Sequence, residues 1–253
     1  MFRISQYMQE LQSPPEHPVA RQPAGPVVIW NLVRRCNLTC KHCYSISADI
    51  DFPGELDTAE VFTVMDDLRG FGVPVLILSG GEPLLRPDIF EISRRAREQG
   101  FYVGLSTNGT LINEDNIDTI ASMNYNYVGI SIDGLRDTHD RFRQKAGAFD
   151  ASMRAIRLCR EAGIKVGMRF TPTQDNAREL PQLLGVMAEE QVDKLYVSHL
   201  NYGGRGNRNR RSDVIHQTSR WVMDLLFERC WEDIQSGRDS EYVTGNNDAD
   251  GVY

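Results

Sequence analysis

Six short apolar segments, separated by segments of helical periodicity, constrain the fold of this chain most strongly. Each is apolar nearly throughout rather than alternating, which is typical of parallel strands buried on both faces of a sheet. The predicted strands span residues 27–33, 73–79, 101–106, 127–132, 164–170 and 194–200.

Helical segments follow these strands. The segment "LDTAEVFTVMDDLRGFG" places Asp57 three residues before Glu60, a capping-box pattern, and it ends at glycines. Comparable segments cover residues 86–100, 113–123, 149–163, 178–190 and 212–237. Six strand–helix units with right-handed crossovers predict an α/β fold, most simply a curved, incomplete (β/α)6 barrel of the TIM type. A flat doubly wound sheet is the alternative, because periodicity does not separate the two.

The two ends of the chain are expected to lie outside this core. Residues 1–26 are interpreted as a peripheral N-terminal segment, in which a short helix precedes a proline-rich linker. Residues 27–211 form the barrel core. Residues 212–253 are expected to contribute a C-terminal helix and the start of an extension.

Composition narrows the class of protein. The 253 residues, of which 41% are hydrophobic and 25% charged, suit one globular α/β barrel. A formal net charge of −7 argues against nucleic acid and anionic membranes as partners. No apolar run approaches the ~20 residues of a membrane span, and the N-terminus lacks the apolar core of a signal peptide. A cytoplasmic location is therefore expected, where thiols stay reduced.

Three of the five cysteines lie close together, as Cys36-x3-Cys40-x2-Cys43. An odd total argues against a disulfide framework, so this trio is interpreted as metal-binding or catalytic. A structural zinc site needs four protein ligands. His42 is a poor fourth ligand, because it adjoins Cys43 and adjacent side chains seldom converge on one small ion. A [4Fe–4S] cluster has one iron per corner, so three cysteines on one loop suit it and leave its fourth iron open.

The two remaining cysteines, Cys159 and Cys230, lie within helical patterns and are expected to be buried in the core. One cluster per chain is therefore predicted. The other unusual segments all come at the carboxyl ends of predicted strands, on the face where barrels build their sites. They are "SGGEP" (79–83), "STNGT" (106–110), "SIDG" (131–134) and "NYGGRGNRNRR" (201–211).

Taken together, these motifs resemble the radical S-adenosylmethionine (SAM) superfamily, over roughly residues 27–200. The resemblance implies a partial (β/α)6 barrel in which Cys36, Cys40 and Cys43 ligate one [4Fe–4S] cluster and SAM chelates the open iron. It implies reductive cleavage of SAM to a 5′-deoxyadenosyl radical, which takes hydrogen from an unactivated C–H bond. The residues expected to contact SAM are His42, Gly80, Gly81, Glu82, Ser106, Thr107, Asn108, Ser131, Asp133 and Arg169. No residue is assigned as a catalytic acid or base.

Longer stretches look closer to one branch of the superfamily, the NirJ proteins of heme d1 biosynthesis. These stretches are "VVIWNLVRRCNLTCKHCYS", "LILSGGEPLLR", "YVGISIDGL", "HLNYGGRG" and "GNNDADG". The resemblance implies removal of propionate side chains from didecarboxysiroheme, a siroheme-derived tetrapyrrole. It also implies a low-potential electron donor such as flavodoxin or ferredoxin. Related branches carry a C-terminal domain with a second cluster, which this sequence is expected to lack, since no clustered cysteines follow Cys43.

Three other functions stay open. Sibling branches of alternative heme synthesis remove acetate groups or decarboxylate propionates, and other relatives with this barrel modify peptides. A metal-binding scaffold domain without catalysis is the non-enzymatic alternative. For a tetrapyrrole substrate, Arg205 and Arg208 are expected to anchor carboxylates, and His199 and Tyr202 flank the same opening.

Overall fold

The computed structural model describes residues 1–14 and 25–245, and it contains one eight-stranded sheet in the order β1-β8-β7-β6-β5-β4-β3-β2. The six predicted strands form the parallel part of this sheet, in register with their neighbours. Their bounds are β2 Val27–Asn31, β3 Val75–Ser79, β4 Tyr102–Thr107, β5 Tyr127–Ser131, β6 Val166–Phe170 and β7 Lys194–Ser198.

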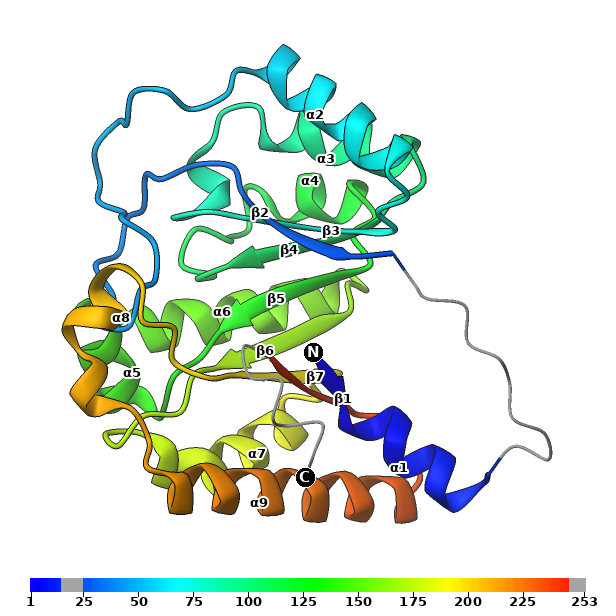
Figure 1. The fold of residues 1–253 in the computed structure, drawn as a ribbon, viewed down its shortest axis with the longest axis vertical. Helices are drawn as coiled ribbons and strands as arrows, with labels where there is room; N and C mark the ends of the chain where they lie inside the picture. Colours follow the sequence, from blue (N-terminus) through cyan, green and yellow to red (C-terminus); the bar gives the residue numbers. More distant parts are fainter. Residues whose placement is uncertain (15–24, 246–253) are drawn as a thin grey trace.

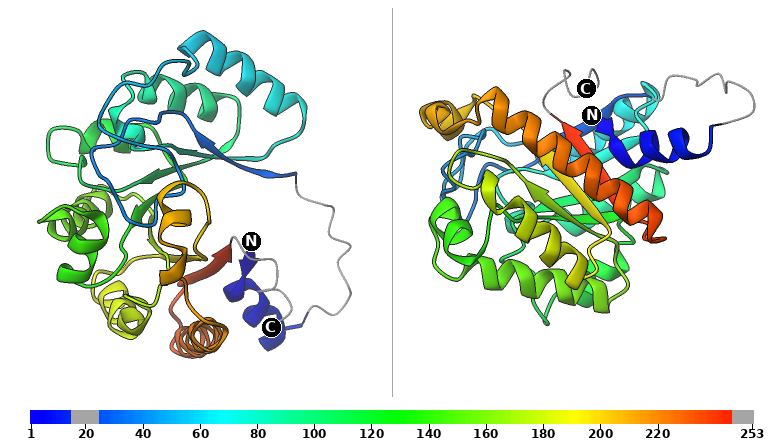
Figure 2. Two further views of the ribbon diagram at one scale, coloured as in Figure 1. Left: turned by 60° about the vertical axis from the view of Figure 1, so that its left-hand side comes forward. Right: turned by 90° about the horizontal axis from the view of Figure 1, so that it is seen from below.

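The sheet is curled, and helices cover its outer face (Figure 1). The covering helices are α2 Thr58–Gly70, α3 Ile89–Glu98, α4 Ile117–Ser122, α6 Ala148–Glu161, α7 Leu180–Glu189 and α9 His216–Gln235. Two shorter helices, α5 Arg136–Arg143 and α8 Gly204–Arg208, follow β5 and β7 at the carboxyl ends of the strands. The incomplete barrel is confirmed, and the flat doubly wound sheet is not what forms (Figure 2).

Two strands of the sheet were not predicted. Strand β8 (Glu241–Gly245) pairs in parallel with β7, and β1 (Phe2–Arg3) pairs antiparallel with β8. The sheet therefore runs beyond residue 211, and the expected boundary between the core and a C-terminal segment does not mark a structural division. Strand β8 covers the edge that β7 would otherwise expose, which removes a row of unpaired backbone groups.

The N-terminal residues are part of the packed unit. Helix α1 (Ile4–Gln12) contacts α9 and β8, and Ile4 is fully buried. The rings of Phe2, Tyr7 and Phe227 lie within 5.8 to 6.3 Å of one another. The short helix was predicted, but its peripheral place was wrong for residues 2–12, because its apolar side chains close the end of the core. The proline-rich linker at 15–24 and most of "GNNDADG" lie outside the described residues.

The core behaves as the apolar patterns predict. Strands β3 to β6 are buried along most of their length, and burial of each large aliphatic side chain contributes about 1.5–3 kcal/mol. The capping box at the start of α2 forms in both directions between Asp57 and Glu60. Cys159 and Cys230 are buried as predicted, and burial raises the pKa of the Cys159 thiol to about 12. In the described ranges, no helix combines the length and apolarity that crossing a membrane requires.

Candidate functional site

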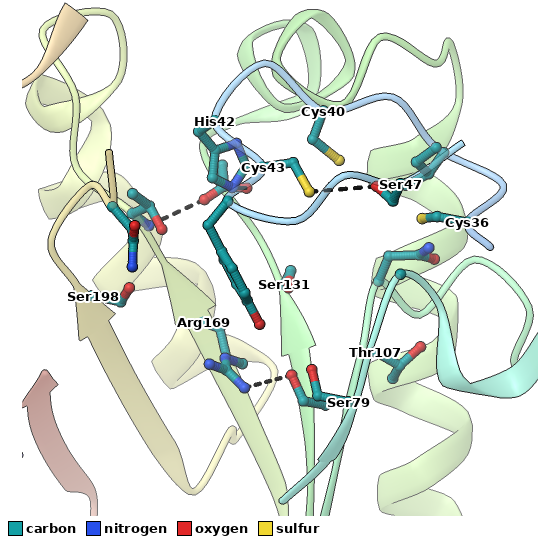
Figure 3. A pocket seen from close by; sticks show the side chains of 18 of the residues that line it. Cys36, Cys40, His42, Cys43, Ser47, Ser79, Thr107, Ser131, Arg169 and Ser198 are labelled. Carbon is teal, nitrogen blue, oxygen red and sulfur yellow. Dashed lines mark hydrogen bonds and ion pairs between the residues drawn. The ribbon is translucent and has the colours of Figure 1, made fainter. Parts of the chain in front are cut away.

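A cavity of about 310 Å³ opens at the carboxyl ends of the parallel strands, where the unusual sequence segments were expected to meet (Figure 3). It is lined by residues from the ends of all six predicted strands, β2 to β7, and from the loops that follow them. Of the residues predicted to bind the cluster, SAM or substrate, it brings together Cys36, Cys40, His42, Cys43, Gly80, Gly81, Ser106, Thr107, Asn108, Ser131, Asp133, Arg169, His199 and Arg205. Glu82, Tyr202 and Arg208 do not line it.

The segment of residues 36–47, here called the cysteine loop, carries the thiol trio into this cavity (Figure 3). The N–H of Cys36 donates to the carbonyl of Ala48 at 3.0 Å, and the N–H of Lys41 donates to that of Phe142 at 2.9 Å. Within residues 1–14 and 25–245, no three His, Cys, Asp or Glu side chains are grouped so as to hold a single metal ion. The three thiols are thus not arranged around one small ion. This arrangement suits a cubic cluster, in which each thiolate binds a separate iron.

Gly80 and Gly81 follow strand β3 and let the chain there pack closely against the residues that lead into the cysteine loop. A Cβ at Gly80 would lie 2.4 Å from the Val33 carbonyl oxygen, and one at Gly81 would lie 2.3 Å from that of Arg35. Gly80 also has a φ of +153°, which side-chain-bearing residues rarely adopt. Any larger residue here would push the cysteine loop away from the sheet, so the two glycines place the loop as well as lining the cavity.

Glu82 is directed away from the cavity. Its carboxylate is fully buried and accepts hydrogen bonds from the Thr107 hydroxyl at 2.7 Å, the Asn108 N–H at 2.8 Å and the Leu84 N–H at 3.2 Å. Burial raises the pKa of this carboxyl, and the three donors oppose that effect. The sequence suggested an ammonium ligand at Glu82. In the structure its recorded hydrogen bonds tie the end of β3 to the end of β4.

Arg143, which the sequence reading missed, is the main buried cation beside the thiols. It forms an ion pair with Asp133 and donates from Nη1 to the Cys40 Sγ at 3.4 Å. Burial opposes its charge, but Asp133 and the Cys40 thiolate raise the pKa of the guanidinium. His139 and Arg143 are spaced i, i+4 on α5, directly after "SIDG", and both are buried. That spacing on one helix face was the available signal.

His42 is held neutral beside this pair. Its ring stacks on Phe142 with centroids 4.5 Å apart, and its Nε2 lies 3.5 Å from Asp133 Oδ2. Burial lowers the pKa of His42 to about 4, although Asp133 acts in the opposite direction. Its Nδ1 is buried and has no hydrogen-bond partner within the part of the chain that the structure describes. The ring therefore keeps one polar atom available at the wall of the cavity.

Arg169 lies across the floor of the cavity (Figure 3). Its guanidinium donates to the Ser106 hydroxyl and stands 5.0 Å from the centre of the Tyr196 ring. No carboxylate partner of Arg169 is recorded among the described residues. A half-buried cation of this kind is suited to bind the carboxylate of a ligand.

The segment after β7 is divided between the cavity and the outer surface. His199 and Arg205 line the cavity, whereas Tyr202 is exposed and its hydroxyl bonds to Asp213. Arg205 is already engaged: Nε donates to the Cys40 carbonyl at 2.8 Å and Nη1 to the Ser47 carbonyl at 2.7 Å. The sequence predicted a substrate anchor at Arg205, but the contacts that the structure records hold the cysteine loop.

Comparison with known proteins identifies the family. The profile described as "Radical SAM superfamily" matches residues 30–185, which is more than half of the chain. The chain belongs to the radical SAM superfamily. Proteins of this superfamily use a [4Fe–4S] cluster and SAM, which agrees with the cluster predicted from the cysteine spacing and with the SAM implied by the resemblance.

Two curated relatives cover most of the chain. It is 51% identical over 254 aligned positions to "Pre-heme d1 synthase" of Dinoroseobacter shibae, covering 100% of this chain and 63% of that protein. It is 43% identical over 228 positions to "Fe-coproporphyrin III synthase" of Methanosarcina barkeri, covering 90% of this chain and 57% of that protein. The chain thus spans less than two thirds of the length of these relatives.

A solved structure shares the fold. The crystal structure of Streptococcus suis SuiB bound to S-adenosylmethionine superposes with a TM-score of 0.70 at 15% identity, covering 89% of this chain and 51% of SuiB. At that identity the likeness concerns the fold alone.

The residues present fit the family's cofactors. Three thiols face one cavity, as the ligands of a [4Fe–4S] cluster must, and a buried arginine donates to the sulfur of one of them. The same cavity is lined by His42, whose buried Nδ1 has no hydrogen-bond partner in the described part of the chain, and by Arg169. Cys36, Cys40 and Cys43 would hold the cluster, and the polar wall opposite them would hold the charged and hydrogen-bonding groups of SAM.

Proposed function

We propose that this chain is a radical SAM enzyme of heme d1 biosynthesis that removes propionate side chains from didecarboxysiroheme. The observation that carries the proposal is 51% identity along the whole chain to a relative named pre-heme d1 synthase. The second relative is also named for a tetrapyrrole product, which supports the substrate class. When bound, the cluster and SAM supply one-electron chemistry that can break an unactivated C–H bond.

The chain's own residues would bind and position the reactants. Arg169, with Ser106 and Tyr196 around it, offers a fixed cation for a carboxylate. Two apolar side chains that line the cavity, Ile29 and Tyr44, stay 41% and 43% exposed. Exposed apolar surface beside a polar cavity suits a flat macrocycle, which buries its face there while its carboxylates reach the rim.

A low-potential donor such as flavodoxin or ferredoxin is proposed to deliver the electron. We also propose a cytoplasmic location, because the cluster requires its cysteine ligands in the reduced form. All five cysteines are free in the structure.

The test is an anaerobic assay of the reconstituted chain with SAM, a reductant and a panel of tetrapyrroles. We expect about four irons per chain, 5′-deoxyadenosine formation, and a mass loss from didecarboxysiroheme that matches removal of propionate groups. Replacing any cysteine of the trio by alanine should abolish both the iron content and 5′-deoxyadenosine formation, whereas Cys159→Ala should keep both.

Each alternative gives a different result in this assay. Decarboxylation or loss of acetate groups from a related tetrapyrrole, with didecarboxysiroheme unchanged, would favour the chemistry of alternative heme synthesis. This alternative rests on the 43% identity to Fe-coproporphyrin III synthase. Chemistry on none of the tetrapyrroles, with SAM still cleaved, would favour a peptide substrate. A chain that binds iron and never yields 5′-deoxyadenosine would be a scaffold domain.

A further inference from the structure

A cluster of exposed arginines lies immediately outside the cysteine loop. Helix α8 and the 3-10 helix that follows it, Arg210–Ser212, carry Arg208, Arg210 and Arg211, and all three side chains are exposed. Lys41, which lies between two cysteines of the trio, is partly exposed beside them. These four residues are called the basic patch.

The basic patch is fixed to the cysteine loop by hydrogen bonds. The side-chain amide of Asn209 donates to the Lys41 carbonyl at 2.8 Å, and the Gly206 N–H donates to the Cys43 carbonyl at 3.1 Å. A Cβ at Gly206 would lie 3.0 Å from the His42 carbonyl oxygen, so the helix packs closely on the loop. Figure 1 shows α8 beside the loop, and the right-hand view of Figure 2 shows the same segment at the edge of the molecule.

The cations of the basic patch differ from several other surface arginines, which are paired with carboxylates. Arg35, Arg136, Arg154 and Arg157 each pair with a carboxylate. No such pair is recorded for the three arginines of the patch or for Lys41 within the described residues. The Asp213 carboxylate, which accepts from the Tyr202 hydroxyl, lies two residues after Arg211, so one negative charge stands beside the four cations.

A concentration of unpaired cations on a chain of net charge −7 indicates a surface that meets an anion. Because Arg208 is exposed and does not line the cavity, the position favours a partner on the outer surface over a ligand inside. The patch is also fixed to the loop that holds the thiols, so a partner bound to the patch would lie beside that loop.

We infer that the basic patch is the docking surface for an acidic electron-donor protein of the flavodoxin or ferredoxin class. The inference rests on the proposed function, because it requires a cluster that is reduced by a protein donor. Weak redox encounters bury less than about 1,200 Å², so a patch of four side chains, three on one short segment and one on the cysteine loop, is enough to steer such a partner. Positive charge at this place raises the rate of encounter and orients the donor toward the cysteine loop.

The test compares a triple glutamine variant of the three patch arginines with a control that removes the same charge elsewhere. The control substitutes three exposed arginines on other helices, Arg94→Gln, Arg136→Gln and Arg154→Gln. Cluster reduction is followed by absorbance, with a reduced flavodoxin as protein donor and photoreduced deazaflavin as uncharged donor.

We expect the patch variant to be reduced by flavodoxin at least ten-fold more slowly than the native chain at low salt, and the control to match the native chain. The difference should shrink at ~0.5 M salt, because screening shortens the range of the interaction. Deazaflavin should reduce all three chains at one rate. Equal flavodoxin rates in the patch variant and the control would refute the inference, and so would equal slowing with both donors.

A second measurement separates this inference from the proposed function. Calorimetric titration of flavodoxin into each chain reports docking directly and needs no turnover, so it decides the role of the patch even where no 5′-deoxyadenosine forms. Loss of flavodoxin binding in the patch variant alone supports the inference. Loss of tetrapyrrole binding in that variant, with flavodoxin binding retained, overturns it and assigns the arginines to the substrate.

Discussion

Arg205→Ala should loosen the cysteine loop while leaving the barrel folded. The side chain is half-buried and bridges the segment after β7 to the loop, with bonds of 2.8 Å to the Cys40 carbonyl and 2.7 Å to the Ser47 carbonyl. A third bond reaches the Ser47 hydroxyl at 3.2 Å. All three of these bonds end on the cysteine loop, so the effect of the substitution should fall there.

The magnitude follows from these contacts. A hydrogen bond from a charged donor is worth about 1.5–3 kcal/mol, and water replaces part of it at a half-exposed site, so about 2–3 kcal/mol in total is expected. Since about 1.4 kcal/mol corresponds to a tenfold change in an equilibrium constant, the population with an open loop should rise roughly 30- to 140-fold.

The assay is the rate at which an iron chelator removes the metal from the reconstituted chain under anaerobic conditions. We expect Arg205→Ala to lose iron at least ten-fold faster, with far-UV circular dichroism unchanged. Arg205→Lys should give an intermediate rate, because it keeps the charge and loses the planar fork. Arg208→Ala is the matched control, because Arg208 is exposed and makes none of these bonds. Iron loss at the native rate in Arg205→Ala would refute the idea that Arg205 holds the cysteine loop in place.

Three further predictions concern buried groups. Arg143→Gln should shift the cluster midpoint roughly 60 mV more negative, a tenfold effect for a one-electron couple, because a cation beside a thiolate favours the reduced cluster. A redox titration without SAM measures it, with exposed Arg136→Gln as control. Glu82→Gln should cost about 1–3 kcal/mol in urea unfolding, since an amide cannot accept from all its present donors. Unchanged stability with weaker SAM binding would instead restore the ammonium-binding role. His139 accepts from the Asp133 N–H at 3.0 Å, and burial lowers its pKa to about 3. Its stabilising contribution should be complete above pH ~6.5 and be lost as pH falls toward 3, amounting to a few kcal/mol. The same pH slope of unfolding in His139→Gln would contradict this assignment.

The parallel strands could be predicted because each one is a nearly continuous apolar run. The structure places all six within two residues of the expected starts and within two of the expected ends. Strand β8 escaped prediction because "EYVTG" is short and has polar residues at positions 241 and 244. Its burial comes from pairing with β7 and β1 and from contact with α1, which local periodicity does not report.

The site could be predicted only in part, for a related physical reason. Parallel strands deliver their carboxyl-terminal loops to one face, so the positions of the thiols, Gly80 and Ser131 at the cavity followed from the strand order alone. The directions of side chains depend on partners that are distant in sequence. Arg205 meets Cys40 across 165 residues and Arg143 meets it across 103. No spacing rule along the chain predicts such contacts.

These long-range contacts all join segments at the carboxyl ends of the strands to one another. Glu82 joins the end of β3 to the end of β4, Arg143 joins α5 to Cys40, and Arg205 joins the segment after β7 to the same residue. Three thiolates on one irregular loop bind a cluster best when the loop keeps its shape without the iron. A loop that becomes ordered only on binding loses conformational entropy at that step, which weakens binding of the cluster. Some of the polar residues that the sequence suggested as ligand contacts therefore hold the loop in place. Ser131 lines the cavity, and no side-chain hydrogen bond of it is recorded in residues 1–14 and 25–245, so it can serve the ligand itself.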